Sequence, residues 1–219
     1  MDGVTEVQKN NDLIFFGQVN ASISHELINI LAIISETTGL LNDLMKMSAG
    51  GKEVAPESIM SCGNDIIGEI QRGFATINQM NRFSHSVDKA IDRIDLIKLI
   101  ELIMALTGFL SFACRLRLQK PSENDSTLQT CPFRLQKLIY KTVVYAFKAT
   151  GPEGEVLITV NRETDNSARI AFSGIGSLIS DPFPSENVNK LAASIGAEVR
   201  MKGKGAIEIM APELDAPGE

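Results

Sequence analysis

His25 is the side chain of this sequence with the strongest candidacy for chemistry, because an acid and an amide stand close to it. The residues around it are Ala21-Ser22-Ile23-Ser24-His25-Glu26-Leu27-Ile28-Asn29. A neutral imidazole is available near pH 7 and can accept a transferred group. An outward-facing imidazole flanked by Glu26 and Asn29 is typical of a group presented to a second molecule, so we take these three residues as the candidate catalytic residues.

A long amphipathic helix must position these side chains. Over residues 11–48 the helical period continues without a proline or an internal charged break. One heptad position holds Leu13, Asn20, Leu27, Ile34 and Leu41, and the other holds Phe16, Ile23, Ile30, Thr37 and Leu44. In this register His25 occupies the outermost position, and Asn29 follows one turn later on the same side.

A second helix is predicted to pair with the first. Residues 49–52 are Ala-Gly-Gly-Lys, which stops the first helix, and Pro56 begins the next. Its predicted apolar seam comprises Ile59, Gly63, Ile66, Ile70, Gly73, Ile77 and Met80, continuing toward Val87 and Ile91. Two helices joined by a short loop form an antiparallel hairpin. One hairpin covers both apolar stripes poorly, so we expect a homodimer built as a four-helix bundle.

The second half of the chain predicts a mixed domain. Residues 96–118 are apolar and compatible with a helix, and residues 134–150 form an amphipathic helix. Further along, the pattern predicts strands over 155–161 and 168–172, a helix over 187–195, and a hairpin of 198–201 with 206–210, turned at residues 202–205. The predicted fold class is α+β: a helical hairpin (residues 1–94) followed by an α/β sandwich (residues 95–219), with helices on one face of a mostly antiparallel sheet.

Composition limits the partners. The chain has 219 residues, 44% hydrophobic and 22% charged, as expected for a soluble globular protein. A net charge of -6 argues against nucleic acid or an anionic membrane as the partner. No uninterrupted apolar run reaches about 18 residues, and we find no secretory signal. Cys62, Cys114 and Cys131 are odd in number and widely spaced, which favours reduced cytoplasmic thiols over a metal site.

The His25 segment resembles a known family. The sequence of residues 24–34 is SHELINILAII, similar to the phospho-acceptor helix of two-component sensor histidine kinases, which carries SHELRNPL. Ile28 and Ile30 depart from the basic residue and the proline of that family. The resemblance implies that His25 carries a phosphoryl group on a ring nitrogen, that Glu26 orients or polarises the imidazole, and that Asn29 positions a water or the partner's phospho-aspartate.

The second half departs from the kinases where they bind ATP. The resemblance places Lys141 and Tyr145 where the kinases have two asparagines, and tyrosine is a poor magnesium ligand. It also places Phe172 in the Asp-x-Gly-x-Gly motif, here Phe172-Ser173-Gly174-Ile175-Gly176, and leaves only residues 177–186 for the glycine-rich lid. Gly174 and Gly176 are more typical of a turn than of a phosphate loop. We therefore expect a degenerate domain that keeps the sandwich and binds no ATP, metal or other cofactor.

Among related proteins the chain is most similar to the bacterial histidine phosphotransferases derived from kinases, of the ChpT type. This resemblance implies that His25 relays phosphoryl groups to and from the aspartates of response-regulator receiver domains, which supply the magnesium. Two alternatives stay open: a response-regulator phosphatase that uses Glu26 and Asn29, and a non-catalytic scaffold that docks a regulator. An active autokinase is the least favoured. The other histidine, His85, is expected to be a surface residue.

Overall fold

The computed structural model describes residues 2–108, 110, 114–120, 126–163, 166–203 and 205–215, with side chains from residue 9 onward. The chain divides into two compact units, which end and begin at Arg82 and Phe83. We call them the helical unit and the α/β unit. The sequence-based boundary, between residues 94 and 95, lies 12 residues after this division. The segment between the two boundaries contains a short 3-10 helix, η1 (His85–Val87), and most of a strand, β1 (Asp92–Asp95), and it groups with the α/β unit.

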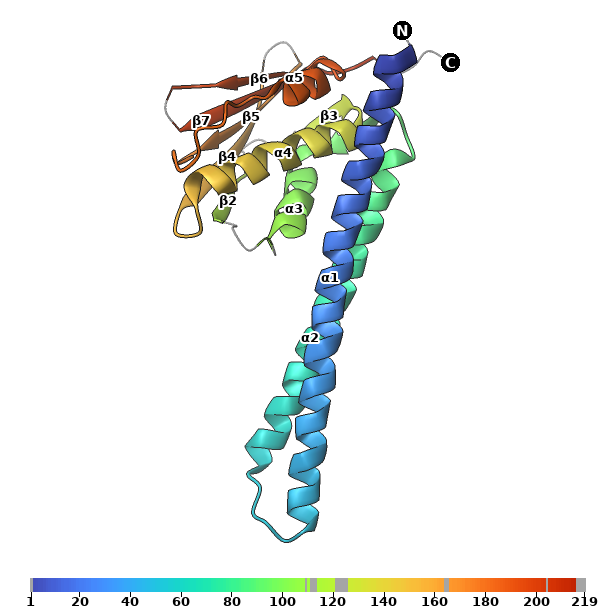
Figure 1. The fold of residues 1–219 in the computed structure, drawn as a ribbon, viewed down its shortest axis with the longest axis vertical. Coiled ribbons are helices and arrows are strands. Elements are labelled where there is room, and N and C mark those ends of the chain that lie inside the picture. The colour runs from blue at the N-terminus through green and yellow to red at the C-terminus, as the bar shows by residue number, and fades with distance from the viewer. Residues whose placement is uncertain are drawn as a thin grey trace. The chain divides into compact units, whose positions relative to one another are not determined.

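The helical unit is an antiparallel pair of long helices, α1 (Asp2–Ala49) and α2 (Pro56–Ser84) (Figure 1). Helix α1 begins well before residue 11, because residues 2–10 contain no proline and extend a helix that is already nucleated. The predicted stop is confirmed: Gly51 has a φ of 79° and donates its N–H to the carbonyl of Ser48 at 3.0 Å. Positive φ is the conformation that glycine adopts without steric cost.

The predicted seam of α1 is correct in part: Leu13 is 69% exposed, whereas Phe15 and Val19, which the prediction did not include, are buried. Ile23 and Ile30 are buried at 1% and 2% exposure, and Leu27, Ile34 and Leu41 are half-buried. The predicted seam of α2 is correct only in part. Its members separate into a half-buried set, Ile59, Gly63, Ile66, Gly73 and Met80, and an exposed pair, Ile70 and Ile77, each 43% exposed. The α2 helix also ends at Ser84 and does not continue to Val87 or Ile91.

The α/β unit contains a five-stranded sheet and a two-stranded sheet. Its remaining elements are α3 (Leu96–Thr107), β2 (Arg115–Gln119), β3 (Thr127–Thr130), α4 (Pro132–Thr150), β4 (Glu155–Arg162), β5 (Ala168–Ser173), α5 (Glu186–Ala193), β6 (Glu198–Met201) and β7 (Ala206–Ala211). The larger sheet has the order β2-β4-β5-β7-β6, and β1 pairs with β3. All pairs are antiparallel except β2 with β4.

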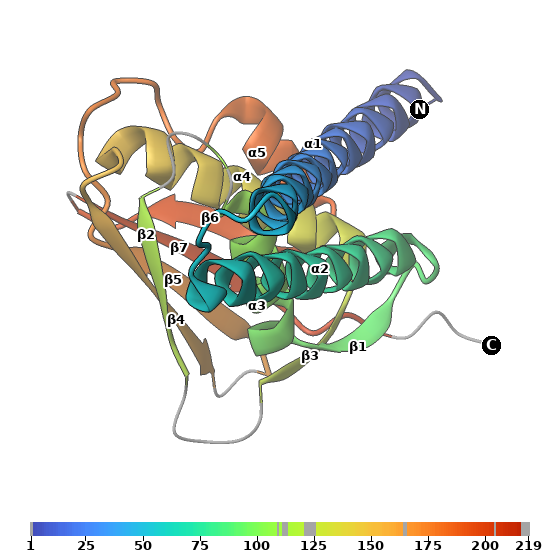
Figure 2. The same ribbon diagram turned by 90° about the horizontal axis from the view of Figure 1, so that it is seen from below.

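Helices α3, α4 and α5 lie on one face of the five-stranded sheet (Figures 1 and 2). Strand burial alternates, as in β7, where every second residue from Ile207 to Ala211 is buried. Alternation of this kind places one face of a sheet in the core. The core joins both layers and includes Leu138 and Phe147 of α4 with Ile158 and Phe172 of the sheet. The predicted fold class, a helical hairpin followed by an α/β domain, is confirmed.

The expected helix over residues 96–118 is wrong at its C-terminal end. Helix α3 stops at Thr107, and Arg115–Gln119 is an edge strand paired with β4, with Leu116 beside Val156. Arg115 and Arg117 are exposed, whereas Leu116 and Leu118 are half-buried. Such a period of two is the strand signature, and the apolar length of the segment concealed it. Strands β1 and β3 also lay outside the sequence-based prediction.

One helical stretch of the described residues, Lys9–Ala49, is long and apolar enough to span a membrane by length and composition. A helix that packs against a second helix through an apolar seam meets the same criterion. The stretch by itself therefore assigns no location to the protein.

Candidate functional site

His25 lies midway along α1, on the side away from the apolar seam. Its neighbours in the helix, Ile23 and Ile30, are buried, whereas His25 itself is exposed. Asn29 is exposed as well, and residues four apart share a helix face. The structure thus places the imidazole and the amide side by side on one open face of α1.

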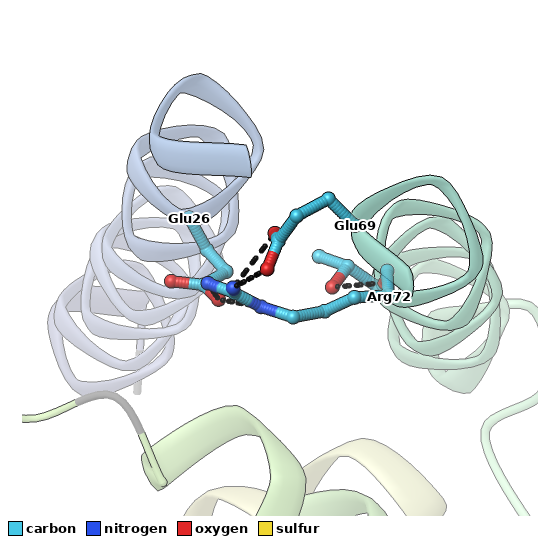
Figure 3. A network of polar contacts seen from close by, with 4 residues as sticks. Glu26, Glu69 and Arg72 are labelled. Atoms are coloured by element: carbon cyan, nitrogen blue, oxygen red, sulfur yellow. Dashed lines mark hydrogen bonds and ion pairs between the residues drawn. The ribbon is translucent and has the colours of Figure 1, made fainter. Parts of the chain in front are cut away.

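Glu26 is separated from this pair. Successive helix residues are about 100° apart around the axis, which turns Glu26 toward α2. There Nε and Nη2 of Arg72 donate to Oε1 of Glu26 at 3.0 and 2.6 Å (Figure 3). The Glu26 side chain is only 15% exposed, although its neighbour His25 faces solvent. The three predicted site residues therefore occupy two faces of the helix.

A second carboxylate completes the contacts of Arg72. Its Nη1 donates to Oε1 and Oε2 of Glu69, one turn earlier on α2, at 2.9 and 2.8 Å (Figure 3). The hydrogen bond to Glu26 is the main cause that raises the pKa of Arg72 above its ordinary value, against the opposing effect of desolvation. The guanidinium is therefore fully charged and lies between two carboxylates.

Sequence reasoning missed Arg72 and Glu69. The two residues that pair across the hairpin, Glu26 and Arg72, are 46 positions apart. Their meeting depends on the register of α2 against α1, which the length and path of the loop decide. The available signal was the pair Glu69 and Arg72 itself, because acid and base three residues apart share a helix face.

His85 is a surface residue, as expected from the sequence. Its side chain is 75% exposed in η1. It has an acidic neighbour one turn along the chain: its Nδ1 lies 2.7 Å from Oδ2 of Asp88. This local pair at the helix end explains the residue without any catalytic role.

Two of the residues that the resemblance matches to nucleotide-binding positions of the kinases, Tyr145 and Phe172, are aromatic. Tyr145 on α4 stacks on Phe183 with ring centroids 4.4 Å apart and an interplanar angle of 25°. Its hydroxyl donates to the carbonyl of Asp181 at 3.4 Å. Phe172 on β5 is 0% exposed and belongs to the core. The side chains of Tyr145 and Phe172 thus both contact other residues of the α/β unit.

The Gly174 and Gly176 pair forms a turn fixed by the protein's own backbone. A Cβ on Gly174 would lie 2.6 Å from the carbonyl oxygen of Glu155, and a Cβ on Gly176 would lie 2.5 Å from that of Ala149. Gly174 also has a φ of 84°. Just beyond, the N–H of Leu178 donates to the carbonyl of Ala149 at 2.9 Å. These glycines are required for close packing of the turn against β4 and the end of α4.

Candidate metal ligands form no cluster in the described part of the chain, where no group of three or more His, Cys, Asp or Glu side chains could hold a metal ion. Cys62, Cys114 and Cys131 are all free thiols.

The similarity of this chain to known proteins is found among solved structures. No protein-family model matches it, and no curated protein matches it. Among solved structures, it is similar to a bacterial phosphotransferase, with 15% identity and a TM-score of 0.49 over 90% of this chain and 96% of that one. It is also similar to the histidine kinase AdeS of Acinetobacter baumannii, with 10% identity and a TM-score of 0.48 over 82% of this chain and 96% of that one.

A third similar structure is the histidine kinase ThkA in complex with the response regulator protein TrrA. The identity is 17% and the TM-score 0.43, over 95% of this chain and 65% of that one.

Proposed function

We propose that this protein is a histidine phosphotransfer protein of a two-component phosphorelay. His25 accepts a phosphoryl group from the aspartyl phosphate of one receiver domain and donates it to the aspartate of another. The observation that carries this proposal is the open face of α1, where an exposed imidazole lies beside the exposed amide of Asn29 on a rigid helix. Positioning of this kind is the main requirement of phosphoryl transfer.

The proposed step balances within the two partners. The lone pair of the unprotonated ring nitrogen of His25 attacks phosphorus, and an N–P bond forms. The bond from phosphorus to the aspartate oxygen breaks, and its electron pair returns to the carboxylate. The second ring nitrogen keeps its proton, so the product is a phosphoimidazolium that loses this proton to water. The reverse sequence delivers the group to the next receiver, and each receiver's own metal site supplies the magnesium.

Apolar side chains beside His25 offer a docking surface for a receiver. Ile28 and Leu31 are 60% and 64% exposed on α1, within two turns of the histidine. Exposed apolar residues clustered around a reactive group are typical of a protein interface. We propose that a receiver domain seats on these residues and brings its aspartate to the imidazole.

A response-regulator phosphatase is the second candidate. The exposed amide of Asn29 favours it, because an amide can orient a hydrolytic water. The engagement of the Glu26 carboxylate by Arg72 weighs against it, because these contacts turn the carboxylate toward α2 and away from the face that carries Asn29. A scaffold without chemistry would require neither an exposed histidine nor its amide neighbour.

Phosphorylated receiver domains test the proposal. We expect acid-labile radiolabel to move from a receiver to the wild-type protein and to His85→Ala, but to be absent from His25→Ala. His85→Ala is the matched control, since it removes the other histidine of the chain. Loss of receiver label without any label on this protein would support the phosphatase instead. No change in receiver label would support the scaffold.

We further propose that two copies form a four-helix bundle. Five large apolar residues of α2 face solvent in the single chain; we call them the outer stripe: Met60 (66%), Ile67 (55%), Ile70 (43%), Phe74 (64%) and Ile77 (43%). Met60, Ile67 and Phe74 are seven residues apart, as are Ile70 and Ile77. Alternating steps of three and four residues are typical of a helix seam that packs against another helix.

We also propose that the α/β unit binds no ATP and that the protein acts in the cytoplasm. The stacked Tyr145 and Phe183 and the buried Phe172 do not fit a magnesium-nucleotide complex, which requires oxygen ligands and an accessible acceptor for adenine. Calorimetric titration with Mg-ATP tests this, and micromolar affinity would overturn it. Three free thiols are consistent with a reducing compartment.

A further inference from the structure

The relay mechanism gives no role to Arg72. This charged side chain nevertheless pairs with Glu26, the residue next to His25. It comes from α2 and makes four donor contacts to two carboxylates, Glu26 and Glu69 (Figure 3). Both carboxylates are more buried than Arg72: their side chains are 15% and 19% exposed, against 42% for the arginine. The arrangement is more specific than a typical surface ion pair, because one planar guanidinium serves two acceptors from two helices.

This network acts on the residue next to His25. Glu26 follows the histidine directly in α1, and its carboxylate is drawn toward α2 by two donors that share the same oxygen, Oε1. Without those donors, the carboxylate on its flexible side chain would be free to turn toward solvent. It would then add a full negative charge to the surface around the imidazole.

We propose that Arg72 is a positioning residue for phosphoryl transfer at His25. It holds the Glu26 carboxylate against α2 and offsets part of its charge, so that an incoming phosphoryl group meets an open imidazole with that carboxylate turned away from it. This role rests on the proposed relay function and deepens it. Glu26 then serves neither as a base nor as a water ligand but must be kept out of the reaction path.

The size of the effect follows from the charges involved. A phosphoryl group carries nearly two negative charges, and an unpaired carboxylate on the adjacent residue lies within about one Debye length of it. At a solvated surface, repulsion between such charges several ångströms apart corresponds to about a tenfold change in rate. The paired state of Glu26 avoids most of this penalty.

The test compares phosphoryl transfer in four variants of the full-length protein at low ionic strength. We expect Arg72→Met to lower the rate of transfer from a phosphorylated receiver to His25 about tenfold. Glu26→Gln alone decides between this proposal and the sequence-based expectation of a catalytic Glu26: the proposal predicts a rate lowered by less than about twofold, whereas a catalytic Glu26 predicts a much larger loss. The double variant Arg72→Met/Glu26→Gln should recover most of the wild-type rate, because the carboxylate that adjoins the histidine is gone and the remaining one, Glu69, belongs to α2.

Lys46→Met is the matched control. It also removes one cation of an ion pair on the hairpin, the 3.4 Å contact with Asp43, but at the far end of α1 from His25. Its transfer rate should equal that of the wild type. Circular dichroism of all variants checks that the helices persist.

Ionic strength separates electrostatics from a structural defect. Raising the salt from about 0.05 M to about 0.5 M shortens the Debye length and should shrink the difference between Arg72→Met and wild type to less than about threefold. A defect that persists at high salt and is not recovered by Glu26→Gln would overturn the proposal, as would an unchanged rate in Arg72→Met. A wild-type protein that accepts no label from any phosphorylated receiver would instead overturn the relay function itself, and the role of Arg72 with it.

Discussion

The helical unit and the α/β unit differ in the exposure of the side chains at their candidate ligand-binding positions. In the helical unit the imidazole, an amide and a stripe of large apolar residues all face solvent. In the α/β unit the residues at ligand-type positions turn inward, with Phe172 fully buried and Tyr145 stacked on Phe183. The comparison teaches that side chains stay accessible where they point away from a helix seam and become inaccessible where neighbouring side chains fill the space around them.

The same contrast holds for glycine. In α2, a Cβ on Gly63 or Gly68 would have nothing within 4 Å, so those glycines leave space open in the single chain. In the α/β unit, a Cβ on Gly174, Gly176 or Gly205 would lie less than 3 Å from a backbone oxygen. The first set is compatible with a partner helix that approaches closely. The second set is committed to the packing of its own unit.

The strongest test of the contrast is to place a carboxylate where the kinases have one. Phe172→Asp should unfold the α/β unit, because it removes a buried ring, at about 3–5 kcal/mol, and buries an unpaired charge. Chemical denaturation followed by circular dichroism measures the loss. Phe172→Leu is the control and should cost less than about 1.5 kcal/mol. A folded Phe172→Asp protein that binds Mg-ATP would show that the position still faces a nucleotide site.

A charge on the exposed outer stripe of α2 tests the other half of the comparison, the helical unit. Phe74→Glu places a charge in the middle of the outer stripe of α2 and should weaken the proposed dimer at least about 100-fold, because a buried unpaired charge costs several kcal/mol. Light scattering should then report a mass near 23.8 kDa, that of one chain. Phe74→Leu should keep the dimer. Wild-type protein that is already monomeric at working concentration would contradict the prediction.

The aromatic stack predicts a smaller effect. Tyr145→Asn restores the amide of the kinases at this position but removes the contact with Phe183, so it should destabilise the α/β unit by about 1–2 kcal/mol. Isothermal titration should still detect no Mg-ATP. In Tyr145→Phe the stack persists and only the 3.4 Å hydrogen bond to Asp181 is lost, so stability should hardly change. Equal losses in the two variants would argue that the hydroxyl, and not the stack, holds the segment.

The smallest expected effect concerns the cap of α3. Oδ1 of Asp95 accepts from the N–H groups of Ile97 and Lys98 at 2.9 and 3.3 Å and from the hydroxyl of Ser126 at 2.8 Å. Desolvation opposes the charged form, but these bonds outweigh it and lower the pKa of Asp95 below its ordinary value. Its stabilisation is therefore complete above the unfolded-state pKa and is lost as the pH falls through the lower, folded-state value.

Asp95→Ala should accordingly cost about 1 kcal/mol near pH 7. The difference in unfolding free energy between this variant and the wild type should shrink as the pH falls below about 4. Urea titrations across that range measure it. A difference that stays constant down to about pH 2 would mean that the carboxylate charge contributes nothing to the cap.

Local patterns sufficed for much of the fold. The heptad spacing of Ile23, Leu27 and Ile30 placed the seam and the exposed His25, and Gly51 marked the end of α1. Alternation predicted β4, β5 and the hairpin of β6 with β7, and the fold class followed. Strand β2 was not predicted, because its apolar residues also fit a helix. The conformation of such a short strand depends on the strand it pairs with, here β4.

By itself, then, the sequence determined that His25 and Asn29 lie on the exposed side of α1, because helix periodicity is a local property of the chain. Only the tertiary structure decided where Glu26 points, since its partner Arg72 comes from the other helix, 46 residues away. It also decided which apolar residues of α2 face outward and that Tyr145 meets Phe183. Those outcomes depend on register and packing between distant segments, which no local pattern encodes.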